Sequence, residues 1–286
     1  MSPRGRLLPA YRKTAEYYDA IYSWKDYAAE SREIERLVRR FGRPGARTLL
    51  DVACGTGSHL AHLRRRFRVH GVDPNPEMLR AARRKLPGVR LVRGRMETLD
   101  LGQTFDVVTC LFSAIGYVRS ERDLRRTLAR FAAHLAPGGV AIVEPWLLPG
   151  RYRAGGFHAQ ILGSPERPIA RMSLSLRRGN RSIMDMHHLV ATGTGVRHWV
   201  EHHDLGLFPP RAYRAAFRAA GLEPRFLPGW NPERGLYVAV RREPIRGSSS
   251  GRPPRGTRGS GGSRRRTASS ASARSGRTRR SPSRRS

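Results

Sequence analysis

The run LLDVACGTG at residues 49–57 constrains the fold more than any other stretch of this chain. Residues 48–52 are largely apolar, which suits a strand that is covered on both faces. Gly55 and Gly57 then lack the side chains that would keep a ligand away from the backbone, and a helix-forming segment begins at Ser58. The first amide groups of such a helix point at the turn. The pattern predicts a Rossmann-like strand, turn and helix that bind a nucleotide or nucleoside.

A second acidic residue narrows the class of ligand. Asp73 ends the short apolar run 69–72 and lies 22 residues after Asp51, which is where Rossmann-like units bind ribose hydroxyls. The dinucleotide pattern G-x-G-x-x-G is incomplete, because Leu60 stands three positions after Gly57. NAD is therefore the less favoured ligand.

With these residues in place, the chain resembles a class I S-adenosylmethionine-dependent methyltransferase over about residues 15–241. Within that family it is most similar to the N,N-dimethyltransferases of the desosamine and mycaminose type, which act on deoxyaminosugars carried by thymidine diphosphate. Besides the glycine turn, this likeness rests on YDAIY at 18–22, KDY at 25–27, FSAIGY at 112–117, EPW at 144–146 and RGLY at 234–237.

We expect one α/β domain over residues 15–243. The resemblance implies a Rossmann-like, doubly wound, seven-stranded methyltransferase sheet, into which an antiparallel β-meander at 168–208 is inserted as a substrate cover. Alternation of period two over residues 169–176, followed by the turn at 178–181, predicts the meander. Residues 1–14 are expected to form a flexible arm, and 244–286, with 13 arginines and no acidic residue, a disordered tail.

The net charge of +33 has two interpretations. Of the 55 basic residues only three are lysines, so we favour a solvated arginine-rich exterior over a surface that attracts phosphates, such as a nucleotide-sugar diphosphate. The tail lacks aromatic residues for base stacking, so nucleic acid is expected to bind there only non-specifically. No apolar run is long enough for a membrane span and no secretory signal is evident, which predicts a cytoplasmic protein.

The resemblance implies S-adenosylmethionine as the cofactor. The cofactor-binding candidates are Tyr27, Asp51, Ala53, Cys54, Gly55, Gly57, Asp73, Met78, Met96 and Leu111. Two interpretations stay open for Met78 and Met96, adenine contact or core packing, and for Asp51, ligand contact or support of the turn amides. Arg95 stands where relatives commonly have an aspartate beside the adenine amino group and cannot accept that hydrogen bond, so Glu97 is the alternative acceptor.

The same resemblance implies a small-molecule acceptor, a dTDP-aminosugar. The catalytic candidates are Tyr22, Glu144 and His187, because such side chains can select or accept an amine proton. The substrate-binding candidates are Tyr22, Tyr117, Trp146, Leu147, Arg177 and Arg234, with the two arginines placed on the diphosphate. Leu147 replaces the second tryptophan of the family's usual Glu-Pro-Trp-Trp, so nucleotide stacking is expected to differ here.

Several of these assignments have structural alternatives. Tyr22 also suits packing of the N-terminal helix, His187 a satisfied strand histidine, and Arg177 a solvated turn. No metal is expected, since neighbouring residues on a strand, as in the pairs 187–188 and 202–203, point to opposite faces. Only two cysteines occur, Cys54 and Cys110, which gives no disulfide or zinc framework.

Other functions stay open beside transfer to a sugar amine. One is methylation of another small metabolite at an oxygen, a carbon or a glycine-type nitrogen. Another is a nucleic-acid methyltransferase anchored by the basic tail, although FSAIG at 112–116 differs from the Asn/Asp-Pro-Pro-aromatic loop of base-amino methyltransferases. A non-catalytic protein of the same fold and a homodimer are also considered.

Overall fold

The computed structural model describes residues 8–9, 11 and 13–242. The chain divides into two units, Met1–Pro244 and Ile245–Ser286, and every described residue belongs to the first. The tail predicted at 244–286 and most of the arm predicted at 1–14 lie outside the described residues.

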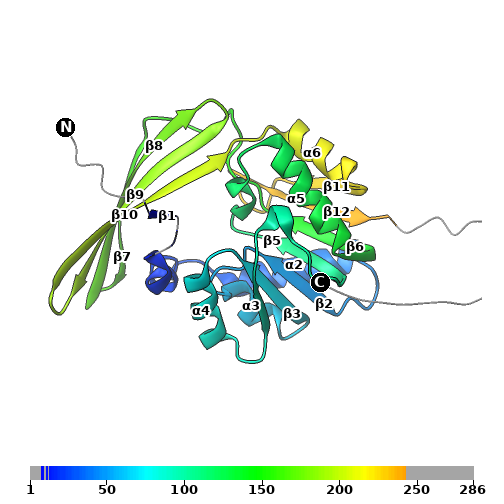
Figure 1. The fold of residues 1–286 in the computed structure, drawn as a ribbon, viewed down its shortest axis with the longest axis horizontal. Coiled ribbons are helices and arrows are strands. Elements are labelled where there is room, and N and C mark those ends of the chain that lie inside the picture. Colours follow the sequence, from blue (N-terminus) through cyan, green and yellow to red (C-terminus); the bar gives the residue numbers. More distant parts are fainter. Residues whose placement is uncertain (1–7, 10, 12, 243–286) are drawn as a thin grey trace, which may run out of the picture. The chain divides into compact units, whose positions relative to one another are not determined.

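A mixed sheet carries the parallel strands of the fold (Figure 1). Its strands lie in the order β11-β12-β6-β5-β2-β3-β4. They are β2 (Thr48–Val52), β3 (Arg68–Asp73), β4 (Arg90–Arg93), β5 (Phe105–Cys110), β6 (Leu135–Val143), β11 (Leu222–Leu227) and β12 (Leu236–Arg241). Strands β2 to β6 pair in parallel, whereas β12 is antiparallel to β6 and β11 is antiparallel to β12. This confirms the predicted Rossmann-like α/β sheet of seven strands.

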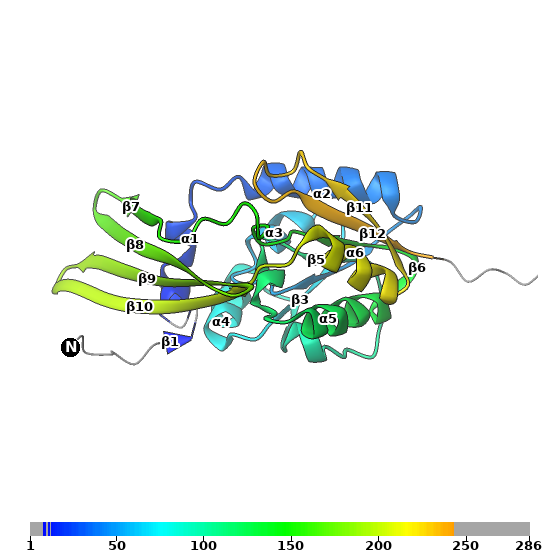
Figure 2. The same cartoon turned by 90° about the horizontal axis from the view of Figure 1, so that it is seen from above.

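Helices cover both faces of this sheet, as its apolar central strands require. They are α2 (Tyr27–Phe41), α3 (Ser58–Leu63), α4 (Pro76–Lys85), α5 (Glu121–Ala133) and α6 (Pro210–Ala219). Leu49 packs in a buried cluster with side chains of α2, α3 and α4, while its neighbour Leu50 packs with α5 and α6. Figure 2 shows α2 and α5 on opposite sides of the sheet. Two buried faces explain why the central strands are almost continuously apolar.

Side chains just before the helices determine where several of them begin. Asn75 accepts the backbone N–H of Glu77 at 2.9 Å at the start of α4, and Asp26 accepts that of Ala29 at 2.8 Å at the start of α2. These N-caps satisfy amide groups that have no partner inside the helix. They also place both helix starts beside the carboxyl ends of the parallel strands.

A second sheet has the order β1-β10-β9-β8-β7, and all its strands except β1 follow β6 in the sequence. Its strands are β1 (Leu8–Pro9), β7 (Phe157–Ser164), β8 (Arg167–Arg178), β9 (Arg181–Thr192) and β10 (Gly195–Gly206). Strands β7 to β10 form an antiparallel meander, the element expected at 168–208. The predicted meander begins at residue 168 and therefore omits β7. No residue of β7 is buried, so its sequence lacks the apolar pattern of an inward face.

The N-terminal segment joins the two sheets. It contains η1 (Thr14–Glu16) and α1 (Tyr18–Ile21), and β1 in the expected arm pairs in parallel with β10. Tyr17, Ile21 and Tyr22 form a buried cluster with Ile169 and Trp199 of the meander. The face of the meander that packs on this segment, called the inner face below, therefore lies next to α1 and Tyr22.

Candidate functional site

The glycine turn after β2 takes a backbone shape that few residues accept. Ala53, Gly55 and Gly57 have φ values of 60°, 56° and 78°, in the left-handed region. A Cβ atom on Gly57 would lie 2.5 Å from the Leu86 side chain, so this position needs glycine for both conformation and space. The Cys54 amide donates to the Val72 carbonyl at 3.0 Å and thereby attaches the turn to β3.

Asp73, at the end of β3, lies against this turn as the sequence spacing predicts. Its carboxylate accepts the backbone N–H groups of Gly55 at 2.9 Å and Asn75 at 2.8 Å. Burial raises the pKa of Asp73 to about 6, and the two amide donors oppose that rise. A carboxylate in this place is suited to ribose hydroxyl groups.

Asp51 lies deeper in the same site. Thr109 of β5 donates its hydroxyl to the Asp51 carboxylate at 2.7 Å. Burial is the largest influence on Asp51 and raises its pKa to about 6. The hydrogen bond from Thr109 thus connects this carboxylate to β5, and the sequence alone did not predict Thr109 as part of the site.

A cavity opens between the turn, α2 and the end of β5. Its lining residues are Tyr18, Tyr27, Asp51, Ala53, Cys54, Gly55, Thr56, Ser58, His59, Leu111 and Phe112. The Tyr27 hydroxyl is buried, faces Ser58 and makes no hydrogen bond of normal geometry among the described residues. A buried hydroxyl without such a partner, beside open backbone at Gly55, fits a polar ligand such as S-adenosylmethionine.

Not every cofactor candidate reaches this cavity. Of the predicted residues, Tyr27, Asp51, Ala53, Cys54, Gly55 and Leu111 line it. Met78 is buried on α4, and Met96 packs in the core cluster with Val72 and Leu99, which matches its alternative interpretation. The exposed Arg95 donates to Glu97 at 2.9 Å.

A polar cluster attaches α1 to the glycine turn. Asp19 accepts the hydroxyl of Thr56 at 2.7 Å and that of Ser58 at 3.2 Å, and it pairs with Lys85 of α4 at 2.8 Å. Lys85 lowers the pKa of Asp19 through a hydrogen bond and its charge, against an opposing effect of burial. We call these four residues the α1 clasp. Sequence reasoning missed it, because Asp19 and Thr56 are 37 positions apart.

Glu144 shapes the backbone at the end of β5. Phe112 and Ser113 both have left-handed φ values, 51° and 61°. The buried Glu144 carboxylate accepts the Phe112 N–H at 2.8 Å and lies 3.6 Å from the Arg234 guanidinium. Arg234 also donates to the Ser113 hydroxyl at 2.8 Å. Glu144, predicted as catalytic, is thus held among these donors.

Tyr22 lies beside the Phe112 turn, with its ring centroid 5.0 Å from that of Phe112. Arg171 of β8 donates to the Tyr22 hydroxyl oxygen at 3.2 Å and to Gln160 at 2.7 Å. Since the guanidinium occupies a lone pair of this oxygen, the Tyr22 proton is left to donate to another group. Arg171 and Gln160 were not predicted.

Tyr117 ends η3 (Ala114–Tyr117) and is hydrogen-bonded to the meander. Its hydroxyl oxygen lies 2.8 Å from Nδ1 of His203 on β10. Ring contacts run from Tyr117 through Tyr11 and Tyr18 to Tyr22, at centroid separations of 6.1, 5.5 and 4.6 Å. Tyr117 is thereby connected to the residues around Phe112.

The structure corrects the assignment of His187 to the site. His187 is exposed, on the face of β9 opposite the N-terminal segment, where it lies 3.2 Å from His198. The adjacent His188 is buried on the inner face and stacks on Trp199 at 5.2 Å. His187 was a candidate through the family resemblance alone, and β9 turns it to the outer face because adjacent residues on a strand point to opposite sides.

The predicted substrate residues fall into two groups. Arg234 lies over the Trp146 ring at 5.6 Å, and the buried Nε atoms of both side chains lack a hydrogen-bond partner among the described residues. Arg177 is exposed and donates to the backbone carbonyls of Gly179 at 2.9 Å and Pro149 at 3.3 Å. Leu147, half-buried, lies between Trp146 and Pro149 in the chain.

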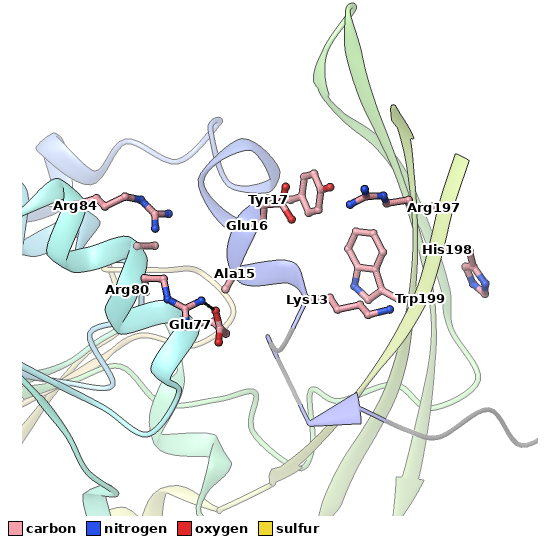
Figure 3. A pocket seen from close by; sticks show the side chains of 11 residues that line it. Lys13, Ala15, Glu16, Tyr17, Glu77, Arg80, Arg84, Arg197, His198 and Trp199 are labelled. Atoms are coloured by element: carbon pink, nitrogen blue, oxygen red, sulfur yellow. Dashed lines mark hydrogen bonds and ion pairs between the residues drawn. The ribbon is translucent and has the colours of Figure 1, made fainter. Parts of the chain in front are cut away.

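A larger cleft of about 660 Å³ lies between η1, α4 and β10 (Figure 3). Its charged lining is mixed, with Arg80, Arg84 and Arg197 accompanied by Glu16 and Glu77. Glu77 is already paired with Arg80. No residue of the glycine turn lines this cleft, so it is separate from the site described above.

The described residues contain neither a metal-binding cluster nor a membrane-spanning helix. Within residues 8–9, 11 and 13–242, no cluster of three His, Cys, Asp or Glu side chains is arranged to hold a metal ion. No helix in this part of the chain is long and apolar enough to cross a membrane.

Comparisons with known proteins place this geometry in context. Residues 49–139 match a family described as a methyltransferase domain. A dTDP-3-amino-3,4,6-trideoxy-alpha-D-glucopyranose N,N-dimethyltransferase of Streptomyces venezuelae is 43% identical over 230 residues, which cover 79% of this chain and 97% of the relative.

Solved structures agree with that match. Streptomyces venezuelae DesVI superimposes with a TM-score of 0.76 at 43% identity, covering 80% of this chain and 98% of DesVI. SAM-bound CalS10, an amino pentose methyltransferase from Micromonospora echinaspora, gives a TM-score of 0.71 at 39% identity, covering 84% of this chain and all of CalS10.

Proposed function

The chain belongs to the class I S-adenosylmethionine-dependent methyltransferases, close to the dTDP-aminosugar N,N-dimethyltransferases, and we propose that it methylates the amino group of a dTDP-linked deoxyaminosugar. The reaction class and the cofactor follow from the family. The sugar and the roles of individual residues belong to the proposal. When bound, S-adenosylmethionine supplies a methyl group on a positively charged sulfur.

The protein's own residues provide the cofactor part of this site. Asp73 would hold the ribose hydroxyls, and the backbone around Gly55 would approach the ligand without a Cβ in the way. The Tyr27 hydroxyl would meet a polar group at the other end. Leu111 and Phe112 would exclude water beside the transferred methyl group.

The pair Trp146 and Arg234 is the observation that best supports a nucleotide-linked substrate. The guanidinium lies over the indole ring, near the turn that carries Phe112. Both Nε donors are buried and lack a hydrogen-bond partner among the described residues. A diphosphate with a neighbouring base carbonyl would satisfy donors of this kind.

In this proposal the protein promotes methyl transfer by orienting the amine toward the methyl group. An amine attacks only when it is neutral, and its lone pair must lie in line with the methyl–sulfur bond. Glu144 is held by Phe112 and Arg234, so we assign it to shaping the turn instead of accepting the amine proton. Tyr22 would donate to the sugar, because Arg171 already donates to its oxygen.

The proposed location is the cytoplasm. Cys54 and Cys110 are both free and buried, as suits a reducing compartment.

Calorimetric titration of the full chain would test the substrate class. The protein is first saturated with S-adenosylhomocysteine, and thymidine diphosphate is then added at moderate salt to screen the arginine-rich surface. We expect both ligands to bind. Binding of the first ligand alone would contradict the nucleotide-sugar proposal and favour another small acceptor.

An activity assay completes this test. The full chain is incubated with S-adenosylmethionine and dTDP-3-amino-3,4,6-trideoxy-alpha-D-glucopyranose, and the sugar is analysed by mass spectrometry. We expect products heavier by one and by two methyl groups. An unmodified sugar would rule out this acceptor.

A further inference from the structure

Five arginines surround a concave surface that the proposed function does not use. Its volume is about 410 Å³, and its lining consists of Phe67 and of Arg47, Arg64, Arg65, Arg66 and Arg68. Among the described residues, no acidic side chain belongs to this lining. By contrast, Asp51 lines the cofactor cavity, and Glu16 and Glu77 line the cleft of Figure 3. We call the concave surface the arginine cavity.

The arginine cavity lies at the edge of the sheet opposite to the cofactor site. Arg47 immediately precedes β2 and Arg68 is the first residue of β3, so both stand at the amino ends of parallel strands. The glycine turn follows the carboxyl end of β2. Helix α3 begins at that turn with Ser58 and spans about 9 Å before Arg64 follows it. The two cavities share no lining residue, so they are separate sites.

Core packing and a backbone hydrogen bond fix the chain around this cavity. Phe67 is 5% exposed and packs in a core cluster with Val69. Arg66 and Arg68, on either side of Phe67 in the chain, are exposed. The backbone N–H of Arg68 donates to the Arg47 carbonyl at 2.7 Å and thereby joins the starts of the two strands. The arginines are thus carried by a backbone that the core holds in place.

Other side chains do not neutralise the charges of these arginines. Within the described part of the chain, none of the five guanidinium groups takes part in an ion pair or a hydrogen bond. The nearby Asp106 carboxylate accepts the backbone N–H of Arg47 at 2.8 Å and lies 3.6 Å from the Arg43 guanidinium. That carboxylate is therefore engaged by groups other than the five guanidinium groups.

Two histidines next to the cavity respond to its positive charge. Burial lowers the pKa of His62, and the charge of Arg65 lowers it further. Burial also lowers the pKa of His70, with further lowering by Arg90 and Arg68. The carbonyl groups at the end of α3 carry only about half of one negative charge, which is too little to balance five guanidinium groups. The arrangement therefore favours an anion with several negative charges.

We propose that the arginine cavity binds a chain of three or more phosphate groups, supplied as inorganic polyphosphate or as part of a nucleoside triphosphate. Guanidinium groups bind phosphate oxygens through paired hydrogen bonds. A single phosphate carries about two negative charges at most, so a chain of phosphates matches five guanidinium groups better. The cavity volume also lies within the range of ligand sites, about 300–1,000 Å³.

A nucleic acid fits this cavity less well. Phe67 is the one aromatic residue of the lining, and because it is buried it offers no face on which a base could stack. The proposal does not depend on the methyl acceptor, since the cavity shares no residue with the cofactor site.

The test compares full-length proteins in calorimetric titrations with inorganic tripolyphosphate. Arg65→Gln/Arg66→Gln removes two charges from the cavity, and the control Arg125→Gln/Arg126→Gln removes two from exposed positions on α5. Residues 244–286 are the same in all these proteins, so any binding by their 13 arginines cancels in the comparison.

The two double variants should differ clearly. At about 0.15 M salt we expect the affinity for tripolyphosphate to fall about 10-fold or more in Arg65→Gln/Arg66→Gln and less than about 2-fold in the control. Equal affinities of the two variants, or no binding by the wild type, would overturn the proposal.

A second measurement locates the ligand on the wild-type protein. Phenylglyoxal modifies exposed arginines, and mass spectrometry identifies the modified positions. We expect tripolyphosphate to slow the modification of residues 64–66 several-fold and to leave Arg125 and Arg126 unchanged. Equal protection of both groups would overturn the proposal.

The same measurement distinguishes the sources of the phosphate chain. Adenosine triphosphate is added to protein that is saturated with S-adenosylhomocysteine, which blocks the cofactor site. Protection of residues 64–66 at lower concentrations than with tripolyphosphate supports a nucleoside triphosphate as the ligand, and equal or weaker protection supports the inorganic chain. Protection by a thymidylate oligonucleotide at a lower phosphate concentration than tripolyphosphate would overturn the proposal in favour of nucleic acid.

Discussion

The carboxylate of Asp73 accepts a hydrogen bond from the backbone N–H of Gly55 at 2.9 Å. The end of β3 is thereby attached to the glycine turn that follows β2. Because Asn75 donates to the same carboxylate at 2.8 Å, Asp73 both supports the turn and places a negative charge where a ribose would bind.

Replacing Asp73 by Asn should weaken cofactor binding. The amide keeps the volume but loses the charge-assisted acceptors, so we expect the affinity for S-adenosylhomocysteine to fall about 10- to 100-fold in calorimetry. Asp100→Asn is the matched control, because this exposed carboxylate accepts the Gly102 N–H at 3.2 Å. Equal affinity in the two variants would contradict the role of Asp73.

Asp51 should make stability depend on pH. Burial raises its pKa to about 6 in the folded protein, whereas an unfolded aspartate titrates near pH 4. Between these values the unfolded chain releases its proton first, so this group lowers the free energy of unfolding as pH rises from about 4 to about 6. The loss persists at higher pH.

Asp51→Asn removes that effect and keeps an acceptor for the Thr109 hydroxyl. In urea unfolding we expect the variant to be more stable than wild type by about 1–3 kcal/mol at pH 7.5, with little difference at pH 4. The same difference at both pH values would show that the charge of Asp51 is not its cause.

Glu144→Gln should destabilise the turn after β5. The carboxylate holds the amide of Phe112, which has a left-handed φ, and lies beside Arg234, to which an amide NH₂ would be a poor partner. We expect thermal and urea unfolding to show a loss of about 1–3 kcal/mol, together with a lower kcat. Glu121→Gln, an exposed carboxylate 3.9 Å from Arg125, is the control and should change stability little.

Arg234 and Arg177 should differ in nucleotide binding. Arg234→Met removes the guanidinium stacked on Trp146, and we expect the affinity for thymidine diphosphate to fall about 10- to 100-fold while that for S-adenosylhomocysteine is unchanged. Arg177→Met removes the same charge from an exposed turn, where two backbone carbonyls already occupy the guanidinium. Equal losses in both variants would indicate a general effect of charge.

The α1 clasp should slow cofactor release. Asp19→Asn weakens the contacts to Thr56, Ser58 and Lys85, so α1 would separate more easily from the glycine turn. We expect S-adenosylhomocysteine to dissociate about 3- to 10-fold faster in stopped-flow measurements. Glu16→Gln, an exposed acidic residue on η1, is the control. An unchanged dissociation rate in Asp19→Asn would show that the clasp does not restrain the ligand.

Features that depend on residues close together in the sequence could be predicted from the sequence. The glycine turn at 53–57 and the position of Asp73 follow from local backbone preferences and from the length of one strand–helix–strand unit. The order of the central strands follows from the same repeated unit, and the resemblance supplied the antiparallel end of the sheet. For these elements, the residues that the local sequence pattern favours are also the residues that the tertiary structure needs.

The meander shows where alternation was insufficient. Its outer face carries exposed apolar side chains such as Met172 and Leu189, while its inner face carries buried ones such as Ile169 and Val190. Period two therefore does not tell the two faces apart, and the resemblance that suggested His187 did not show that His188, not His187, lies on the inner face. Packing of the N-terminal segment on one side decides which face is covered.

The pairings at the site depended on the tertiary structure alone. Tyr117 on η3 and His203 on β10 are 86 positions apart, and they meet because η3 packs against β10. Phe112 and Glu144 are 32 positions apart, and they meet because the parallel neighbours β5 and β6 end side by side. Local sequence restricts the backbone of one segment but not the direction of a side chain toward a distant one. The sequence by itself thus determined the fold, the cofactor turn and the reaction class. The packing of the meander and α1 against the strand ends determined which side chains share hydrogen bonds. Only the tertiary structure could decide this, because a hydrogen bond requires contact within about 3 Å.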